Sequence, residues 1–313
     1  MLALGNRVNA VIVERNKLVA RRIARVLGSS GWATQVVDEP AQVGDQLERA
    51  DLICADAFDG DYIAEQLRAR RGLRAMLWTA EPLRRSLRYM SEVPLDHVLA
   101  RKDFESSPRT WEVAMTARRL FDGSVAPLDA YLEWGYRAAE LPVRTTADRD
   151  VAVSTIQDFV LALAVPKRVA EMFGELGHEL VMNAMYDAPV DARGAVKYAL
   201  DRKADIVLLD HERPTVCIAS DGTRLVLRVR DPFGRLERKH VVEGMVRGLA
   251  SGGEMDQEHG GAGLGMMVCH NASAALFFDV VRGKSTEVTA LFELDQNLRD
   301  LRTQAKSLHF WSD

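Results

Sequence analysis

Residues 224–234 read RLVLRVRDPFG, which is the pattern of a β-strand followed by a turn. Leucine and valine alternate with arginine along most of this stretch, so we expect one strand face to be buried and the other to face water. The four residues before it, SDGT at 220–223, are a strong hairpin signal. They make 215–219 the antiparallel partner and predict an antiparallel sheet in the second half of the chain.

Two helices are predicted before this hairpin and two strands after it. Apolar residues recur at helical spacing in 151–163 and 167–186, whereas 276–281 and 286–293 read as strands. A glycine-rich run, GGAGLG at 260–265, leads into a further helix. Backbone N–H groups at such a helix start can hold phosphate oxygens, although a surface loop is the alternative interpretation. A P-loop is excluded because no Gly-Lys-Ser/Thr is present, and the glycines do not open a βαβ unit.

The first half of the chain has a different pattern. Short apolar runs at 10–13, 52–55, 75–78 and 98–99 alternate with helix-like segments. This alternation predicts a doubly wound α/β fold, a parallel sheet with helices on both faces. The functional residues of such sheets lie at the carboxyl ends of the strands. Those positions hold Glu14, Arg15, Asp56, Thr79, Arg101 and Lys102.

The composition is that of a globular protein with about two domains. The chain has 313 residues, of which 47% are hydrophobic and 27% charged. Residues 1–123 carry a net charge of +2 and residues 124–313 one of −6, so neither half has the basic field of a dedicated nucleic-acid binder. No apolar stretch approaches the ~20 residues that cross a bilayer, and the first residues lack a signal-peptide pattern. We therefore expect a cytoplasmic protein that neither binds nucleic acid nor inserts into a membrane.

The strand-end residues of the first half resemble those of the receiver domain of two-component response regulators. The similarity covers residues 7–122 and rests on an acidic residue, an aspartate, a hydroxyl and a lysine in that order. It implies a flavodoxin-like fold in which Asp56 is the phosphoacceptor. By the same resemblance, Thr79 is the switch hydroxyl and Lys102 is the lysine that contacts the phosphate.

The magnesium site of that family is altered here. Receivers hold Mg²⁺ with two acidic residues, whereas this chain has Glu14 followed by Arg15. An arginine can neutralise the neighbouring Asp56 without binding a metal, and it removes a ligand that Mg²⁺ needs. We therefore expect a degenerate receiver that docks partners. An active phosphosite and a plain strand-end carboxylate are the alternatives.

Three motifs in the second half resemble the ATP-binding domain shared by histidine kinases, gyrase and anti-sigma-factor serine kinases. They are ELVMNA at 179–184, DPFG at 231–234 and GAGLG at 261–265, and Thr286 follows them. The similarity covers about residues 140–296, and its first part looks most like the anti-sigma kinases. It implies a Bergerat-type α/β sandwich that binds ATP and Mg²⁺.

The same resemblance assigns roles to individual residues. Glu179 would be the general base, and Asn183, one helical turn later, would hold the Mg²⁺ that bridges the phosphates. Asp231 would accept a hydrogen bond from the adenine amino group, with Thr286 near the adenine. Hard cations do bind amide oxygens, and a carboxylate one turn away can reach an attacking hydroxyl. The glycines that would surround the phosphates are Gly234, Gly261, Gly263 and Gly265.

Three features depart from the family pattern. Phe233 replaces the glycine that lets the backbone approach adenine. Asp187, in the same helical row as Glu179 and Asn183, places a negative charge near the phosphates unless magnesium intervenes. By spacing alone, this row also fits a solvated helix face. No helix pair with a phosphoacceptor histidine precedes the domain, so we do not expect a self-phosphorylating histidine kinase.

These patterns divide the chain into four parts. A receiver-like domain covers 1–123, a connector 124–140, an ATP-binding domain 141–296 and a C-terminal tail 297–313. The connector carries aromatic residues, so we expect it to be packed and not flexible.

The leading hypothesis is a bacterial signalling protein in which a degenerate receiver regulates a kinase-like domain. That domain would transfer phosphate from Mg·ATP to serine or threonine of a partner protein; ATP hydrolysis without a protein acceptor fits the sequence equally well. The alternative, from a different class, is an interaction scaffold that has lost its chemistry and responds to ATP or to no nucleotide. Arg15, Phe233 and Asp187 favour this alternative. The sequence leaves open the partner's identity and whether the chain forms a homodimer.

Overall fold

The chain forms two compact units, which we describe separately. The structure is a computed structural model that describes residues 8–250 and 262–312. Unit 1 comprises residues 1–131 together with 303–309, and unit 2 comprises 132–302 together with 310–313. No helix in these described ranges is long and apolar enough to span a bilayer.

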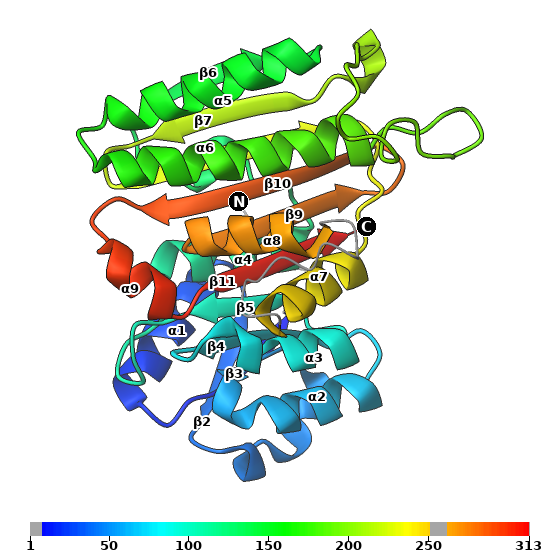
Figure 1. Ribbon diagram of the computed structural model, residues 1–313. Coiled ribbons are helices and arrows are strands. Elements are labelled where there is room, and N and C mark those ends of the chain that lie inside the picture. Colours follow the sequence, from blue (N-terminus) through cyan, green and yellow to red (C-terminus); the bar gives the residue numbers. More distant parts are fainter. Residues whose placement is uncertain (1–7, 251–261, 313) are drawn as a thin grey trace, which may run out of the picture. The chain divides into compact units, whose positions relative to one another are not determined.

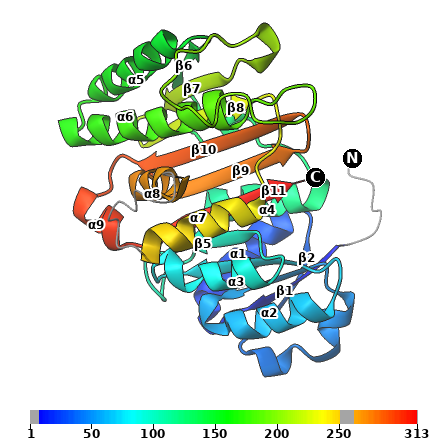
Figure 2. The same ribbon diagram turned by 45° about the vertical axis from the view of Figure 1, so that its right-hand side comes forward.

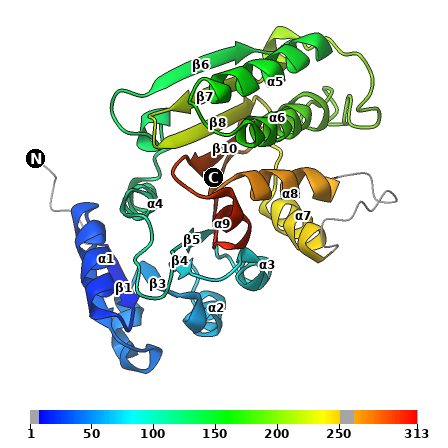
Figure 3. The same cartoon turned by 60° about the vertical axis from the view of Figure 1, so that its left-hand side comes forward.

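Unit 1 is built around a sheet of five parallel strands in the order β2-β1-β3-β4-β5, to which β11 adds an antiparallel sixth. This order is the flavodoxin-like one, as the alternation of apolar runs and helices predicts. Helices α1 and α4 lie on one side of the strands and α2 and α3 on the other (Figure 3). The strands are β1 (Asn9–Val13), β2 (Ala33–Val37), β3 (Leu52–Asp56), β4 (Arg74–Thr79), β5 (His97–Ala100) and β11 (Ser307–Ser312), and the helices are α1 (Lys17–Ser29), α2 (Gly60–Ala69), α3 (Leu87–Glu92) and α4 (Thr110–Asp122).

Local sequence explains how α1 forms and packs. Asn16 caps its N-terminus by accepting hydrogen bonds from the backbone N–H groups of Leu18 and Val19. Val19, Ile23 and Leu27 are buried on one stripe of the helix and join a core cluster that includes Trp32 and Trp78. The stripe has the spacing that turns one helix face toward a sheet.

Unit 2 is an antiparallel sheet in the order β6-β7-β8-β10-β9. Figures 1 and 2 show the long β9–β10 hairpin in orange, and Figures 1 and 3 show α5, α6 and α8 on one face of the sheet. The strands are β6 (Arg137–Pro142), β7 (Thr215–Ser220), β8 (Arg224–Asp231), β9 (Ala275–Val281) and β10 (Ser285–Glu293), and the helices are α5 (Thr146–Leu161), α6 (Lys167–Met182), α7 (Arg238–Ala250), α8 (Ala262–Ala272) and α9 (Leu298–Thr303). The mixed α/β fold class predicted from sequence is confirmed.

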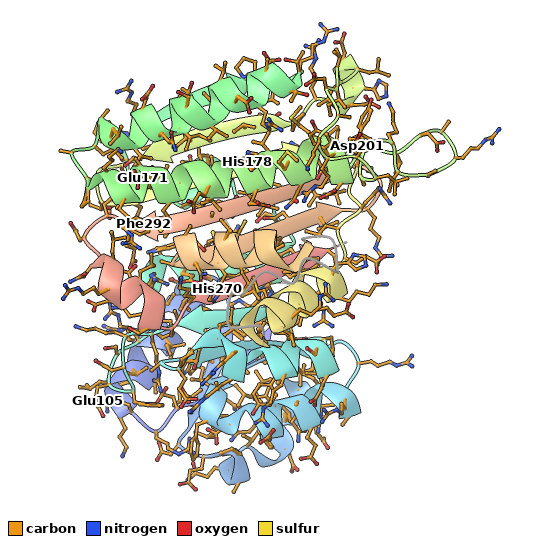
Figure 4. The ribbon with its side chains drawn as sticks, viewed as in Figure 1. Glu105, Glu171, His178, Asp201, His270 and Phe292 are labelled. Carbon is orange, nitrogen blue, oxygen red and sulfur yellow. The ribbon has the colours of Figure 1, made fainter. Side chains whose placement is uncertain are left out.

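The core of unit 2 lies between the sheet and its helices. Phe173 of α6 packs edge-on against Phe292 of β10, with ring centroids 5.8 Å apart, and both rings are buried. Phe292 is labelled in Figure 4 beside α6. Ile156 and Val160 of α5 are also fully buried. The apolar spacing read from these two helices therefore does face the sheet.

The segment expected to be a C-terminal tail, 297–313, contains helix α9 and strand β11. In β11, Leu308 pairs with Val98 and His309 with His97 of β5. Leu308, His309 and Ser307 are all buried. The sequence of β11 is too short to show a clear alternation of apolar and polar residues. Its partner strand lies about two hundred residues earlier in the chain, so no local sequence pattern indicates the pairing.

Candidate functional site

Helix α6 ends in a π-helical turn that carries two of the residues singled out by sequence. The turn spans Asn183–Asp187, and the N–H of Ala188 donates to the carbonyl oxygen of Asn183 at 3.0 Å. Such wide turns within helices are rare and occur frequently at functional sites. Here the turn places Asn183 and Asp187 on the wall of a cavity of about 400 Å³.

The residues that line this cavity come from the end of α6, from the strands β8, β9 and β10, and from α7 and α8. Asp231 and Thr286, which are directly paired residues of β8 and β10, also line it. The structure therefore brings Asn183, Asp231 and Thr286 together in one cavity, although Thr286 lies more than a hundred residues from Asn183. Its apolar wall consists mainly of Leu180, Val229, Met266, Phe278 and Val288.

Asp231 is a buried hydrogen-bond acceptor at this cavity. Its side chain is 8% exposed, and its Oδ1 accepts a hydrogen bond from the N–H of Phe233 at 2.9 Å. Burial raises the pKa of Asp231, while hydrogen bonds from Phe233, Thr286 and Gly234 act in the opposite direction. A carboxylate in such surroundings forms strong hydrogen bonds with any amino group that enters the cavity.

The glycines assigned to phosphate binding have different environments. Gly234 has φ of +63°, and a Cβ there would overlap the carbonyl oxygen of Val281, so the close approach of the β9–β10 turn requires glycine. Gly263 lies in the first turn of α8. A Cβ on Gly265, also in α8, would collide with the carboxylate of Glu179. The remaining glycine, Gly261, lies outside the described residues.

Glu179, the expected general base, does not line the cavity. It is partly buried on α6, and its carboxylate lies against Gly265 of α8. Within the described part of the chain it has no hydrogen-bond or ion-pair partner. The helical row read from sequence is therefore divided: Asn183 and Asp187 face the cavity, and Glu179 faces a neighbouring helix.

An arginine that the sequence did not single out contacts both cavity-lining polar residues of the π-helical turn. Nη2 of Arg202 lies 2.9 Å from Oδ1 of Asn183 and 2.8 Å from Oδ2 of Asp187. Arg202 comes from the loop that follows α6, where Figure 4 labels the adjacent Asp201. The only sequence signal was the unbalanced charge of Asp187, which requires a cation nearby.

These contacts do not fit the magnesium site implied by the resemblance. The amide oxygen of Asn183, which would be the metal ligand, accepts a hydrogen bond from the guanidinium of Arg202. The described ranges contain no group of three or more His, Cys, Asp or Glu side chains able to hold a metal ion. Mg²⁺ requires several oxygen ligands in octahedral geometry, and a guanidinium in the same place repels it.

Unit 1 has its own polar site at the carboxyl ends of its strands. Glu14 and Asp56 are buried, and Arg101, with a side chain only 2% exposed, lies between them. Nη2 of Arg101 is 2.6 Å from Oδ2 of Asp56, and its Nη1 is 3.3 Å from Oε2 of Glu14. The indole N–H of Trp78 also donates to Glu14, at 2.9 Å. Burial raises the pKa of Asp56, and the N–H of Phe58 and the charge of Arg101 counteract this rise.

This geometry corrects which cation neutralises Asp56. Arg15, which was expected to have that role, instead forms a two-pronged ion pair with Asp59, with N–O distances of 2.5 and 2.9 Å. Its guanidinium also lies 5.0 Å from the ring centroid of Phe58. Arg101 takes the role because β5 ends at Ala100, which makes Arg101 the first residue beyond the strand.

The two remaining strand-end residues, Thr79 and Lys102, do not line the cavity of about 460 Å³ at this end of unit 1. Lys102 is exposed. Thr79 is buried, and its hydroxyl accepts a hydrogen bond from the N–H of Glu81 at 3.0 Å. The cavity is lined by Glu14, Arg15, Asn16, Asp56, Phe58, Arg101, Phe104 and Glu105, the last of which is labelled in Figure 4.

Two solved structures are similar to parts of this chain. The alignment with a response regulator from Thermotoga maritima covers 37% of this chain and 98% of the response regulator chain, with 12% identity and a TM-score of 0.29. The alignment with a chain of the SiaB–SiaC complex from Pseudomonas aeruginosa covers 50% of this chain and 88% of that chain, with 13% identity and a TM-score of 0.32. No protein-family model and no curated protein matches the sequence. The receiver-like architecture of unit 1 therefore rests on its own strand order and strand-end residues.

Proposed function

We propose that this chain is a signalling protein whose unit 2 binds an adenine nucleotide and whose receiver-like unit 1 acts without being phosphorylated. The observation that carries the proposal is the cavity of unit 2. A buried carboxylate, Asp231, lies on its strand wall, and the polar pair Asn183 and Asp187 lies on its helical wall. The sequence resemblance to ATP-binding domains supports the same assignment.

The shape and chemistry of the cavity suit a purine base. A volume of about 400 Å³ is in the range of small-molecule sites, which are mostly apolar with a few placed polar groups. Leu180, Val229 and Phe278 offer apolar surface to the ring. Asp231 offers an acceptor for the exocyclic amino group, which guanine and hypoxanthine lack at the corresponding position.

The acidic pair of unit 1 favours a role without phosphoryl transfer. Phosphorylation of Asp56 by the receiver reaction uses Mg²⁺ held by neighbouring carboxylates. Here both Asp56 and Glu14 are paired with the buried Arg101, which supplies the neutralising charge permanently. We therefore propose that unit 1 docks partner proteins in one fixed charge state.

A second candidate function is phosphoryl transfer to a partner or to water, with Glu179 as the base. It is favoured by one observation: Glu179 has no ion-pair partner among the described residues and lies one turn before Asn183 on α6. ATP turnover by the wild type and by Glu179→Gln tests it. A rate that is measurable and lost in the variant supports catalysis, whereas no turnover above background supports the binding role.

Calorimetric titration tests the nucleotide assignment. We expect ATP to bind with micromolar affinity, about −8 kcal/mol, and inosine triphosphate, which lacks the amino group, to bind at least about tenfold more weakly, because Asp231 would lose its hydrogen-bond donor. Asp231→Asn should weaken ATP binding similarly, and Asp158→Asn, on the exposed side of α5, is the matched control. Equal binding of the two triphosphates would contradict the role of Asp231. Absence of binding by both would refute the nucleotide assignment itself.

A further inference from the structure

We propose that Arg202 takes the place of a divalent cation at the nucleotide site, so that unit 2 binds the phosphates of its ligand without Mg²⁺. This inference rests on the nucleotide-binding role proposed above and names the form of the ligand: the free, metal-free nucleotide polyphosphate. It also explains the presence of Asp187, which would otherwise repel a phosphate chain.

The side-chain oxygens of Asn183 and Asp187, which a metal ion at this turn would use, already have a partner. Arg202 donates to Oδ1 of Asn183 at 2.9 Å and pairs with Oδ2 of Asp187 at 2.8 Å. A single Nη2 atom makes both contacts, which leaves the other guanidinium N–H groups for further acceptors. Among the described residues, the buried Nε of Arg202 has no hydrogen-bond acceptor. A buried donor without a partner usually indicates a missing acceptor.

Further positive charge lies around the cavity that Asn183 and Asp187 line. Arg235, Arg247 and His240 line it. Nη1 of Arg235 donates to the backbone carbonyl of Ala188 at 3.3 Å, which holds its guanidinium beside the π-helical turn. Guanidinium groups bind phosphate through paired N–H···O hydrogen bonds and keep their charge at every relevant pH. Arg202 and Arg235, which both contact the turn or the residue after it, therefore supply charge that a metal otherwise brings.

Unit 1 contains a buried guanidinium that lies between acidic side chains. There, Arg101 lies between Glu14, which the resemblance places at the magnesium site of receivers, and Asp56, which it makes the phosphoacceptor. In both units a guanidinium contacts one side-chain oxygen that the family resemblances assign to a metal, that of Glu14 in unit 1 and that of Asn183 in unit 2. The sequence of this chain thus combines two sites of the same chemical type, in which arginine charge replaces a cation from solution.

Calorimetric titration of ATP in excess EDTA and in excess Mg²⁺ tests the inference. For the wild type we expect the affinity in EDTA to equal or exceed that in Mg²⁺, because Mg²⁺ neutralises the phosphate charge that the arginines recognise. Arg202→Gln should weaken binding in EDTA by about tenfold or more, the usual effect of losing a charge-assisted hydrogen bond. Because this variant frees Asn183 and Asp187 for a metal, Mg²⁺ should restore part of the lost affinity.

The control is Arg193→Gln, an exposed arginine of the same loop region, whose affinity should match the wild type in both buffers. Binding by the wild type that requires Mg²⁺ would overturn the inference and leave the proposed nucleotide binding intact. Binding in EDTA that Arg202→Gln leaves unchanged would overturn it too, since another group would then hold the phosphates. Absence of binding in both buffers would refute the proposed function together with the inference.

Discussion

Replacement of Arg101 by methionine should destabilise unit 1 strongly. The change removes the guanidinium and its positive charge but keeps an unbranched apolar stem, so that the packing of the stem is retained. It leaves Glu14 and Asp56 buried without their shared counter-ion. A buried charge with no partner is one of the few causes of large losses in stability from a single substitution.

The distances give the scale of the effect. With an effective dielectric constant of about 20, Coulomb's law gives about 6 kcal/mol for the 2.6 Å pair with Asp56 and about 5 kcal/mol for the 3.3 Å pair with Glu14. The cost of removing these groups from water offsets a large part of both values. Experiments that remove one partner of a buried ion pair typically find a loss of about 3–5 kcal/mol, which we expect here.

The loss should depend on pH in a defined direction. In the wild type, burial raises the pKa of Asp56 and Arg101 opposes the rise, so its removal should raise the pKa further. A group with a raised native pKa contributes stability below its unfolded pKa and loses it as pH rises through the native value. The variant should therefore be closest to the wild type in acid, near a pH of about 4, and fall furthest below it at neutral pH.

Urea unfolding followed by tryptophan fluorescence measures this prediction, because Trp78 donates directly to Glu14. Arg118→Met is the matched control: its ion pair with Asp122 has an N–O distance of 2.6 Å, but the Arg118 side chain is 53% exposed. Surface pairs of this kind contribute less than about 1 kcal/mol. The reasoning is refuted if both variants lose the same small amount, or if the loss in Arg101→Met does not shrink toward acid pH.

Two further predictions concern backbone geometry and a buried lysine. Gly234→Ala should cost about 3 kcal/mol or more, because a left-handed alanine costs about 1–2 kcal/mol and the clash with Val281 adds to it. Gly194→Ala, with φ of +81° but no atom near the added Cβ, should cost only the first part; equal urea midpoints for the two variants would contradict the clash. Burial lowers the pKa of Lys306 from 10.5 to about 7, so the unfolded chain binds more protons between these values and wild-type stability should rise with pH across that range. Lys306→Met should be more stable than the wild type at neutral pH and should lack this rise, and an unchanged slope in urea titrations would argue against the buried lysine as its cause.

Local patterns in the sequence were sufficient for most of the secondary structure. The alternation in 224–230 predicted β8, and the SDGT segment predicted its hairpin with β7. The apolar runs of the first half predicted a parallel sheet, and their ends identified Glu14 and Asp56 as neighbours. These features depend on residues that are close together in the chain, and the side-chain periodicities of helices and strands can be read directly from such residues.

The expected site residues were found partly together and partly apart. Asp231 and Thr286 share a cavity because strand register aligns them, whereas the sequence resemblance implied only that both lie at the same end of the site. Glu179 was expected beside Asn183 in the same site, but α8 approaches that turn of α6 so closely that only glycine fits opposite its carboxylate. Helical spacing predicts on which face of the helix a residue lies, but the packing of neighbouring helices decides what that face contacts.

The sequence by itself determined the types of elements, the two-part organisation and the acidic residues at each candidate site. Only the tertiary structure decided which cations meet them: Arg101 and not Arg15 for Asp56, and Arg202 for Asn183 and Asp187. It also decided that residues 303–309 return to β5. The physical reason is that an ion pair or an added strand joins residues that are distant in the chain. The intervening loops decide which of these residues meet, and the periodicity of helices and strands carries no information about that. The charge of an arginine can be read from sequence, but its counter-ion is selected by packing.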